Sequence, residues 1–166
     1  MTTTTLSHGR VTWTNIINPT GDDTCLLAER YPHFHPLNLK DCLTELEYPK
    51  LDHYDDYVFL IVQFPYWDQD EHVSRPAEVD IFVAKGVLVT SHRGELKPLV
   101  EMFARVQADE TYRAEAMGQG ASPLLYRLLS SLVDYCFPIV HKVSHNLQQA
   151  ETGLFRGESR HILNQV

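Results

Sequence analysis

Two β-rich segments with only two residues between them constrain the fold of this chain more than any other feature. Residues 79–84 and 87–91 are dominated by apolar and β-branched side chains, and only Lys85 and Gly86 separate them. So short a connection fits a tight antiparallel hairpin, in which glycine takes the positive φ at little steric cost. The chain is therefore expected to contain an antiparallel hairpin and the sheet to which this hairpin belongs.

Further strands are indicated on the N-terminal side of the hairpin. Residues 11–17 interleave β-branched and aromatic side chains as a strand does, until Asn18 and Pro19 break the pattern. Residues 57–64 are almost continuously apolar, which is typical of a strand covered on both faces. We expect this strand to lie in the centre of the sheet.

Helical periodicity marks the segments between and after the strands. Amphipathic patterns predict helices over residues 22–31 and 96–106, and a short helix over residues 36 to 47–49. From residue 122 onward the apolar residues keep the helical period, and Pro138 within this stretch should bend or break the helix. The whole pattern predicts an α/β fold in which a mixed, partly antiparallel sheet lies between helical layers, with a long C-terminal helix.

The length of the chain suits one domain. Its 166 residues, 43% of them hydrophobic, suffice for one core, so we expect residues 10–166 to form a single domain. Residues 1–9 are polar and have no burial pattern, which predicts a loose terminus. The longest uninterrupted apolar run, residues 57–62, is far shorter than the roughly 18 residues that suggest a membrane span. Residues 160–166 still show helical spacing, and we expect the natural protein to continue past them.

Charge and cysteine content exclude several classes of protein. The formal net charge of −8, from 22 acidic and 14 basic residues, would repel nucleic acid and anionic membrane surfaces. Cys25, Cys42 and Cys136 are odd in number and lack metal-like spacing, so neither a disulfide framework nor a zinc ribbon is indicated. Nucleophile elbows, Walker loops and dinucleotide fingerprints are missing as well. We expect a cytosolic domain that is not an enzyme and has no nucleic-acid partner.

Two histidine pairs have spacings that could serve a metal. His33 and His35 are two residues apart, but a tetrahedral zinc site needs further ligands that the local sequence does not supply. His141 and His145 are four residues apart, yet Lys142 stands where a hydrolytic His-Glu-x-x-His motif has its acid. A helix-entry loop and a solvated helix face are the favoured interpretations.

The short helix carries the most suggestive polar pattern. Asn38, Asp41 and Glu45 project oxygen atoms from one of its faces. Such oxygens suit a hard cation such as Mg²⁺, which takes only one or two carboxylates and keeps several waters. The face could therefore be half of a site that another surface completes, although a solvated face explains the same pattern. The apolar stripe expected on the opposite side consists of Leu37, Cys42, Leu43 and Leu46.

Several motifs together resemble the cytosolic domain of CorA magnesium and cobalt transporters. They stand in the family's order and spacing, and the match extends over residues 13–155. The motifs are His35-Pro-Leu37 with Asp41, Pro49-Lys-Leu51, Tyr54-Asp-Asp-Tyr-Val-Phe-Leu60, Glu78-Val-Asp-Ile-Phe82, Leu88-Val-Thr90, Leu124-Leu-Tyr126 and Leu132-Val-Asp134.

The resemblance implies a homopentamer whose cytosolic part is an α/β/α sandwich. A long stalk helix and two membrane helices would follow outside this chain, so that the domain itself lies on the cytoplasmic side of the inner membrane. It would sense intracellular Mg²⁺ and thereby gate a pore formed beyond this fragment. Selectivity and conduction are therefore not assigned to any residue here.

Asp41 occupies the position of the family's aspartate that faces a stalk-helix acid of the neighbouring subunit. A regulatory divalent ion, Mg²⁺ or Co²⁺, bridges the two carboxylates, which repel each other until the ion neutralises them, and thereby holds the pore closed. Asp41 is accordingly the metal-binding residue expected in this chain. Lys40 and Ser130 stand where some members have acids, which weakens the case for a second cation site beside the first.

Other functions also fit the sequence. Nine histidines would suit a zinc-transporting member of the same family. A free-standing soluble regulator that binds divalent metals would need no membrane segment, and the reading frame after Val166 discriminates it from a transporter. A metal-dependent hydrolase is disfavoured because no base, nucleophile and ligand set converges.

Overall fold

The computed structural model describes residues 3–44, 46–68, 71 and 73–155, and the chain divides into two compact units, Met1–Leu132 and Val133–Val166. The first unit holds the entire described sheet, and the described part of the second is the later portion of one helix. The single domain expected over residues 10–166 stays a prediction. Most of the described side chains after Leu132 are exposed.

The sheet has six strands in the order β1-β2-β6-β5-β4-β3. Neighbouring strands are antiparallel except β2 and β6, which run parallel, so the predicted mixed sheet is confirmed. The strands are β1 (Thr3–His8), β2 (Val11–Ile17), β3 (Lys50–His53), β4 (Tyr57–Asp68), β5 (Val73–Ala84) and β6 (Val87–His92).

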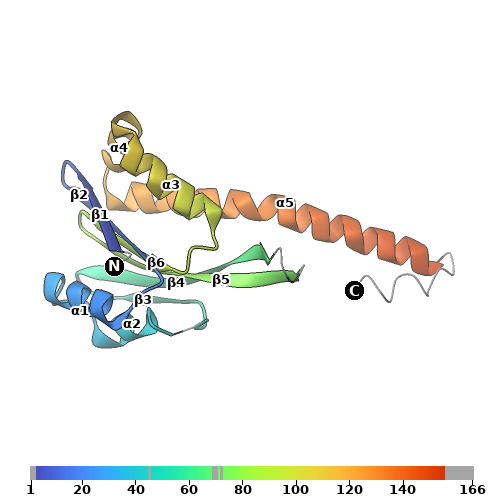
Figure 1. Cartoon of the computed structure of the whole chain (residues 1–166), viewed down its shortest axis with the longest axis horizontal. Helices are drawn as coiled ribbons and strands as arrows, with labels where there is room; N and C mark the ends of the chain where they lie inside the picture. Colours follow the sequence, from blue (N-terminus) through green and yellow to red (C-terminus); the bar gives the residue numbers. More distant parts are fainter. Residues whose placement is uncertain (1–2, 45, 69–70, 72, 156–166) are drawn as a thin grey trace. The chain divides into compact units, whose positions relative to one another are not determined.

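Helices cover both faces of this sheet. In the first unit, α1 and α2 lie on one face and α3 lies on the other (Figure 1), which confirms the predicted α/β/α layers. The long C-terminal helix is confirmed as α5. The helices are α1 (Gly21–Arg30), α2 (Pro36–Asp41), α3 (Lys97–Ala108), α4 (Glu110–Met117) and α5 (Ala121–Phe155).

A hydrophobic core lies on each side of the sheet. On the side of α1 and α2, Phe34 stacks on Phe82 with ring centroids 4.5 Å apart, inside a cluster that also includes Leu27 and Leu39. On the other side, the fully buried ring of Trp13 meets Phe103 edge-on at 4.9 Å. Burial of large aromatic side chains on both faces is what holds the two helical layers to the sheet.

The predicted hairpin is present between β5 and β6. Ala84 pairs with Val87, and Gly86 has a φ of +76°. A Cβ atom at Gly86 would lie 2.5 Å from the carbonyl oxygen of Arg10, in the turn between β1 and β2. Glycine is therefore required here both by backbone conformation and by the close approach of a second turn.

The prediction of a loose terminus at residues 1–9 is wrong for its described part. Thr3–His8 forms β1, an edge strand antiparallel to β2. Thr5 and Thr14 share a hydrogen bond of 3.0 Å across the pair, and Thr3 donates a hydrogen bond to Asp23 of α1. Threonine is favoured in strands whatever its polarity, and cross-strand hydroxyl pairs stabilise an exposed edge that has no apolar pattern.

The strand at residues 57–64 is not central, contrary to the prediction. It belongs to β4, which lies one place from the edge of the sheet and continues to Asp68. Its burial alternates, with Phe59 and Ile61 fully buried and Leu60 between them only partly so. Apolar residues on the less buried face made the strand resemble a fully covered one.

Helix α5 continues through Pro138, so the predicted break is absent, whereas a bend at this residue stays a prediction. Over Ala121–Gln149 it is long and apolar enough to cross a membrane by length and composition, with a mean hydropathy of 1.2 and 17% of that window buried. Its first turns nevertheless belong to the core of the first unit, where Leu124, Leu128 and Leu132 are fully buried. The expectation about residues 160–166 falls outside the described residues.

Candidate functional site

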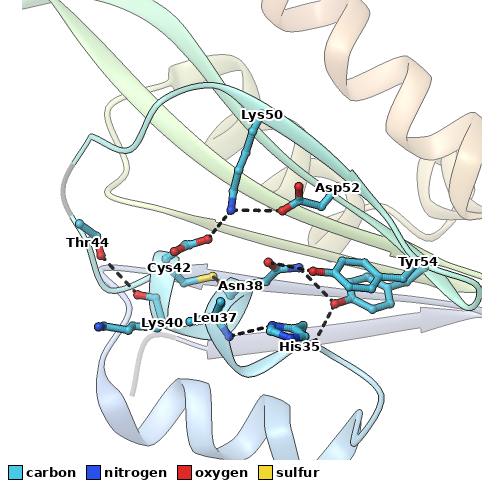
Figure 2. A network of polar contacts seen from close by, with 11 residues as sticks. His35, Leu37, Asn38, Lys40, Cys42, Thr44, Lys50, Asp52 and Tyr54 are labelled. Atoms are coloured by element: carbon cyan, nitrogen blue, oxygen red, sulfur yellow. Dashed lines mark hydrogen bonds and ion pairs between the residues drawn. The ribbon is translucent and has the colours of Figure 1, made fainter.

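Helix α2 is fixed to the sheet by polar contacts with two tyrosines. The Tyr57 hydroxyl accepts hydrogen bonds from the backbone N–H of His35 at 2.8 Å and from Nδ2 of Asn38 at 3.1 Å, and the Tyr54 hydroxyl donates to Oδ1 of Asn38 at 3.5 Å. Figure 2 shows Asn38 directed toward Tyr54. Because Asn38 is 99% buried, these contacts set which face of α2 packs against the sheet.

The apolar stripe predicted for this helix is largely wrong. The helix ends at Asp41 instead of near residues 47–49, and Leu37, Leu43 and Leu46 are exposed by 40% or more. Only Cys42 of the predicted stripe is buried. Asn38 is buried in place of the leucines because the Tyr57 hydroxyl satisfies its amide, a partner that is distant in sequence and invisible to a periodicity argument.

Asp41 forms an ion pair with a lysine from the next strand. Lys50 Nζ lies 2.7 Å from Oδ2 of Asp41 and 3.1 Å from Oδ2 of Asp52, so one ammonium bridges two carboxylates. Figure 2 shows Lys50 extending toward Asp52. The hydrogen bond to Asp41 raises the pKa of Lys50. The Asp41 side chain is 19% exposed and therefore remains accessible at the end of α2.

These residues fit a regulatory divalent cation as one half of a site. A partly exposed carboxylate is the ligand type that Mg²⁺ prefers, but a single carboxylate does not form a complete site. Of the other oxygens predicted on this face, Asn38 is engaged with the tyrosines, and Glu45 lies outside the described residues. A cation that binds Asp41 must either displace the ammonium of Lys50 from this carboxylate or bind beside it.

The histidine pairs form no metal site in the described part of the chain. His35 caps α2, because its Nδ1 accepts a hydrogen bond from the backbone N–H of Leu37 at 3.2 Å. His33 packs edge-on against Tyr57 with ring centroids 5.9 Å apart, and His145 contacts Gln149 one helical turn away. Among the described residues no group of three or more histidine, cysteine, aspartate or glutamate side chains is arranged to hold a metal ion.

A second polar cluster, not predicted as a site, lies on β5 and β6. Asp80 is 96% buried beside its cross-strand partner Ser91, and Glu78 follows on the same face of β5. Burial, together with the negative charges of Glu78 and Asp41, raises the pKa of Asp80 to about 8. The sequence did contain a signal for this cluster. Glu78 and Asp80 alternate with apolar residues in a strand, and this spacing places both acids on one face of the sheet.

A third polar cluster lies on the opposite face of the sheet and is fully hydrogen-bonded. Trp13 Nε1 donates to Thr90 at 3.0 Å, and Thr90 donates to Oδ1 of Asn15 at 2.6 Å. The backbone N–H of Gly94 donates to Nδ1 of His92, so Nε2 of His92 carries the proton and donates to Asn15 at 3.0 Å. Burial lowers the pKa of His92 to about 4, which keeps the ring neutral. This cluster is structural, since each ring nitrogen already has its partner.

Comparison with known proteins gives a match to one family over nearly the whole chain. The family model described as "CorA-like Mg2+ transporter protein" matches residues 8–166. A Bacillus subtilis protein named "Putative metal ion transporter YfjQ" is 31% identical over 139 residues, which are 84% of this chain and 41% of that protein. The "Cobalt/magnesium transport protein CorA" of Thermotoga maritima is 25% identical over 84% of this chain and 39% of its own length. The chain thus spans about two fifths of the length of these curated relatives.

Solved structures show the same fold. The soluble domain of CorA from Methanocaldococcus jannaschii superposes with a TM-score of 0.73 at 19% identity, over 94% of this chain and 60% of that one. The cytoplasmic domain of ZntB from Vibrio parahaemolyticus gives a TM-score of 0.61 at 14% identity, over 86% of this chain and 56% of that one. At such identities the likeness concerns the fold alone.

Proposed function

The chain belongs to the CorA-like Mg²⁺ transporter family, and from this membership we propose that it is the cytosolic regulatory domain of a divalent-cation transporter. In this proposal it senses intracellular Mg²⁺ and gates a pore formed by segments outside the chain. Magnesium or cobalt is the transported ion, as the names of the family and of the relative from Thermotoga maritima suggest. The relatives are named as transporters and not as enzymes, which agrees with the lack of a catalytic motif.

The accessible carboxylate of Asp41 at the end of α2 is the observation that supports sensing. Lys50 holds this carboxylate in place while leaving it 19% exposed. In a homopentamer on the cytoplasmic side of the membrane, a second acid from the neighbouring subunit would complete the site. Mg²⁺ between the two carboxylates removes their repulsion and favours the packed, closed assembly.

Substitution of Asp41 tests this role in the full-length transporter. Asparagine keeps the size and one oxygen of the side chain but removes the charge, so we expect Asp41→Asn to weaken inhibition by cytosolic Mg²⁺ while transport persists. A coupling of about 1–3 kcal/mol corresponds to roughly a 5- to 150-fold shift in the inhibitory concentration. Uptake or current is titrated against internal Mg²⁺.

The matched control is an acid outside the ion pair. Asp52 is unsuitable, because it shares Lys50 with Asp41. Asp55 is exposed in the turn before β4, and Asp55→Asn should titrate like wild type. A sensor role for Asp41 is refuted if Asp41→Asn leaves the curve unchanged or if Asp55→Asn shifts it equally.

A further inference from the structure

We propose that a cavity beside β5 and β6 binds a hydrated divalent cation through Glu78, Asp80 and Ser91. This site is distinct from Asp41 and lies entirely within the first unit. It does not depend on the proposed sensing role, because none of these three side chains belongs to the ion pair of Asp41 with Lys50.

The cavity has a volume of about 240 Å³ and opens between the loop after α2 and the strands β5 and β6. Cys42, Thr44 and Leu46 line it on the side of the loop, and Asp80 and Ser91 line it on the side of the sheet. At roughly 30 Å³ per water molecule, the space holds about eight waters. A divalent ion with six first-shell waters therefore fits.

Buried oxygen atoms without partners are the strongest indication of a ligand. Within the described residues, Oδ1 of Asp80, Oγ of Ser91 and Oε2 of Glu78 are buried and have no hydrogen-bond partner. Asp80 and Ser91 are 96% and 100% buried as residues, and they face each other across β5 and β6. Leaving such atoms unpaired is costly, so native structures normally supply a water or an ion to them.

Cys42, which lines the cavity on the side of the loop, does not satisfy these oxygen atoms. The thiol of Cys42 interacts with the side chains of Asp80 and Ser91, but its hydrogen bond in the structure goes to the backbone carbonyl of Asn38 at 3.4 Å. A thiol is a weak donor in any case. Burial raises the pKa of Cys42, so the thiol stays protonated and is no ligand for a soft metal.

The donor set selects a hard cation that keeps its water. Carboxylate and hydroxyl oxygens suit Mg²⁺ or Mn²⁺, and Mg²⁺ is commonly held by one or two carboxylates through a largely intact hydration shell. No preformed cluster of three close metal ligands is found in the described part of the chain, which agrees with binding through waters. Water molecules on the ion supply the donors that the three oxygens lack.

Charges around the cavity favour a cation over neutral water. The carboxylates of Glu78, Asp41 and Glu47 all act on Asp80 with the same negative sign. Two arginines also line the cavity: Arg75 is held by Asp68 and Glu71, and Arg93 partly offsets the charge of Glu78.

Paramagnetic broadening by Mn²⁺ tests the proposal on the full chain, labelled with ¹⁵N and freed of metal with a chelator. Mn²⁺ should broaden the amide signals of Asp80 and Ser91, and excess Mg²⁺ should reverse the broadening. The titration is done above the raised pKa of Asp80, about 8, where this carboxyl is ionised. Asp80→Asn keeps the shape of the side chain and should weaken this binding roughly tenfold or more, because it removes the charged acceptor. Ser91→Ala should weaken it less. Unfolding measurements on both variants show that they are folded.

Variants at Asp41 and Asp80 distinguish the two proposed cation sites experimentally. Asp41→Asn removes only a neighbouring negative charge, so it should weaken the broadening at β5 and β6 less than Asp80→Asn, which removes a ligand of the ion. Absence of broadening at the cavity in wild type at millimolar Mn²⁺ overturns the proposal and assigns the space to water. Equal broadening in wild type, Asp80→Asn and Ser91→Ala overturns it as well.

Discussion

Substituting Asp80 should remove a loss of stability that the wild type undergoes as the pH rises. Asp80 is almost fully buried, and its folded pKa is raised from 3.8 to about 8. Between these two values the folded state holds a proton that the unfolded state has released. Protonated Asp80 therefore contributes stability that is fully present below about pH 4 and is lost as the pH rises towards about 8.

The size of the effect follows from the width of this window. Each pH unit inside it changes the free energy of unfolding by about 1.4 kcal/mol. Between pH 5 and pH 7 the wild type should lose about 2.7 kcal/mol through this one group. Asp80→Asn cannot titrate, so the variant should gain about this amount relative to wild type over the same range.

Urea unfolding in the presence of a chelator measures the effect without interference from bound ions. The fluorescence of Trp13, which is fully buried in the first unit, reports unfolding at pH 5, 6, 7 and 8. Asp55→Asn is the control, since an exposed turn acid should give a curve parallel to wild type. The reasoning is refuted if the difference between Asp80→Asn and wild type is independent of pH.

Three further predictions address other parts of the structure. His92 is neutral and buried with a pKa of about 4 against an ordinary 6.5, so its contribution to stability is lost as pH falls from 6.5 to 4, by up to about 3 kcal/mol, and His92→Gln should flatten acid unfolding followed by circular dichroism. Gly86→Ala forces a Cβ to within 2.5 Å of a backbone carbonyl oxygen and should cost about 1–3 kcal/mol in urea unfolding, more than Gly9→Ala, where φ is +58° but the space is open. Lys50→Gln frees Asp41 from an ion pair worth about 0.2–1 kcal/mol and should lower the Mg²⁺ concentration that inhibits transport by about 1.4- to 5-fold, opposite in direction to Asp41→Asn.

Much of the fold follows from the sequence because local chemistry dictates it. The connection through Lys85 and Gly86 specifies a hairpin, and Pro36 after an N-capping histidine specifies the start of α2. The end of α2 was harder to predict, because leucines continue the helical pattern after the helix has stopped at Asp41. Sequence motifs also located Asp41, but its role as a metal ligand stays a prediction.

What the sequence by itself determined is the order of four strands, β2, β4, β5 and β6, and of the helices other than α4, together with the tight turn and the resemblance to a family. These features depend on neighbouring residues or on motifs. Only the tertiary structure decided the environment of the charged groups. Lys50 meets Asp41 because β3 lies beside α2, and Asp80 becomes a buried acid because Ser91 faces it across the hairpin while the loop after α2 covers both. The parallel pairing of β2 with β6 likewise joins residues about 75 positions apart and assembles the network around Asn15. Burial and electrostatic potential sum over all atoms that surround a group in space, and for that reason no local pattern could have supplied them.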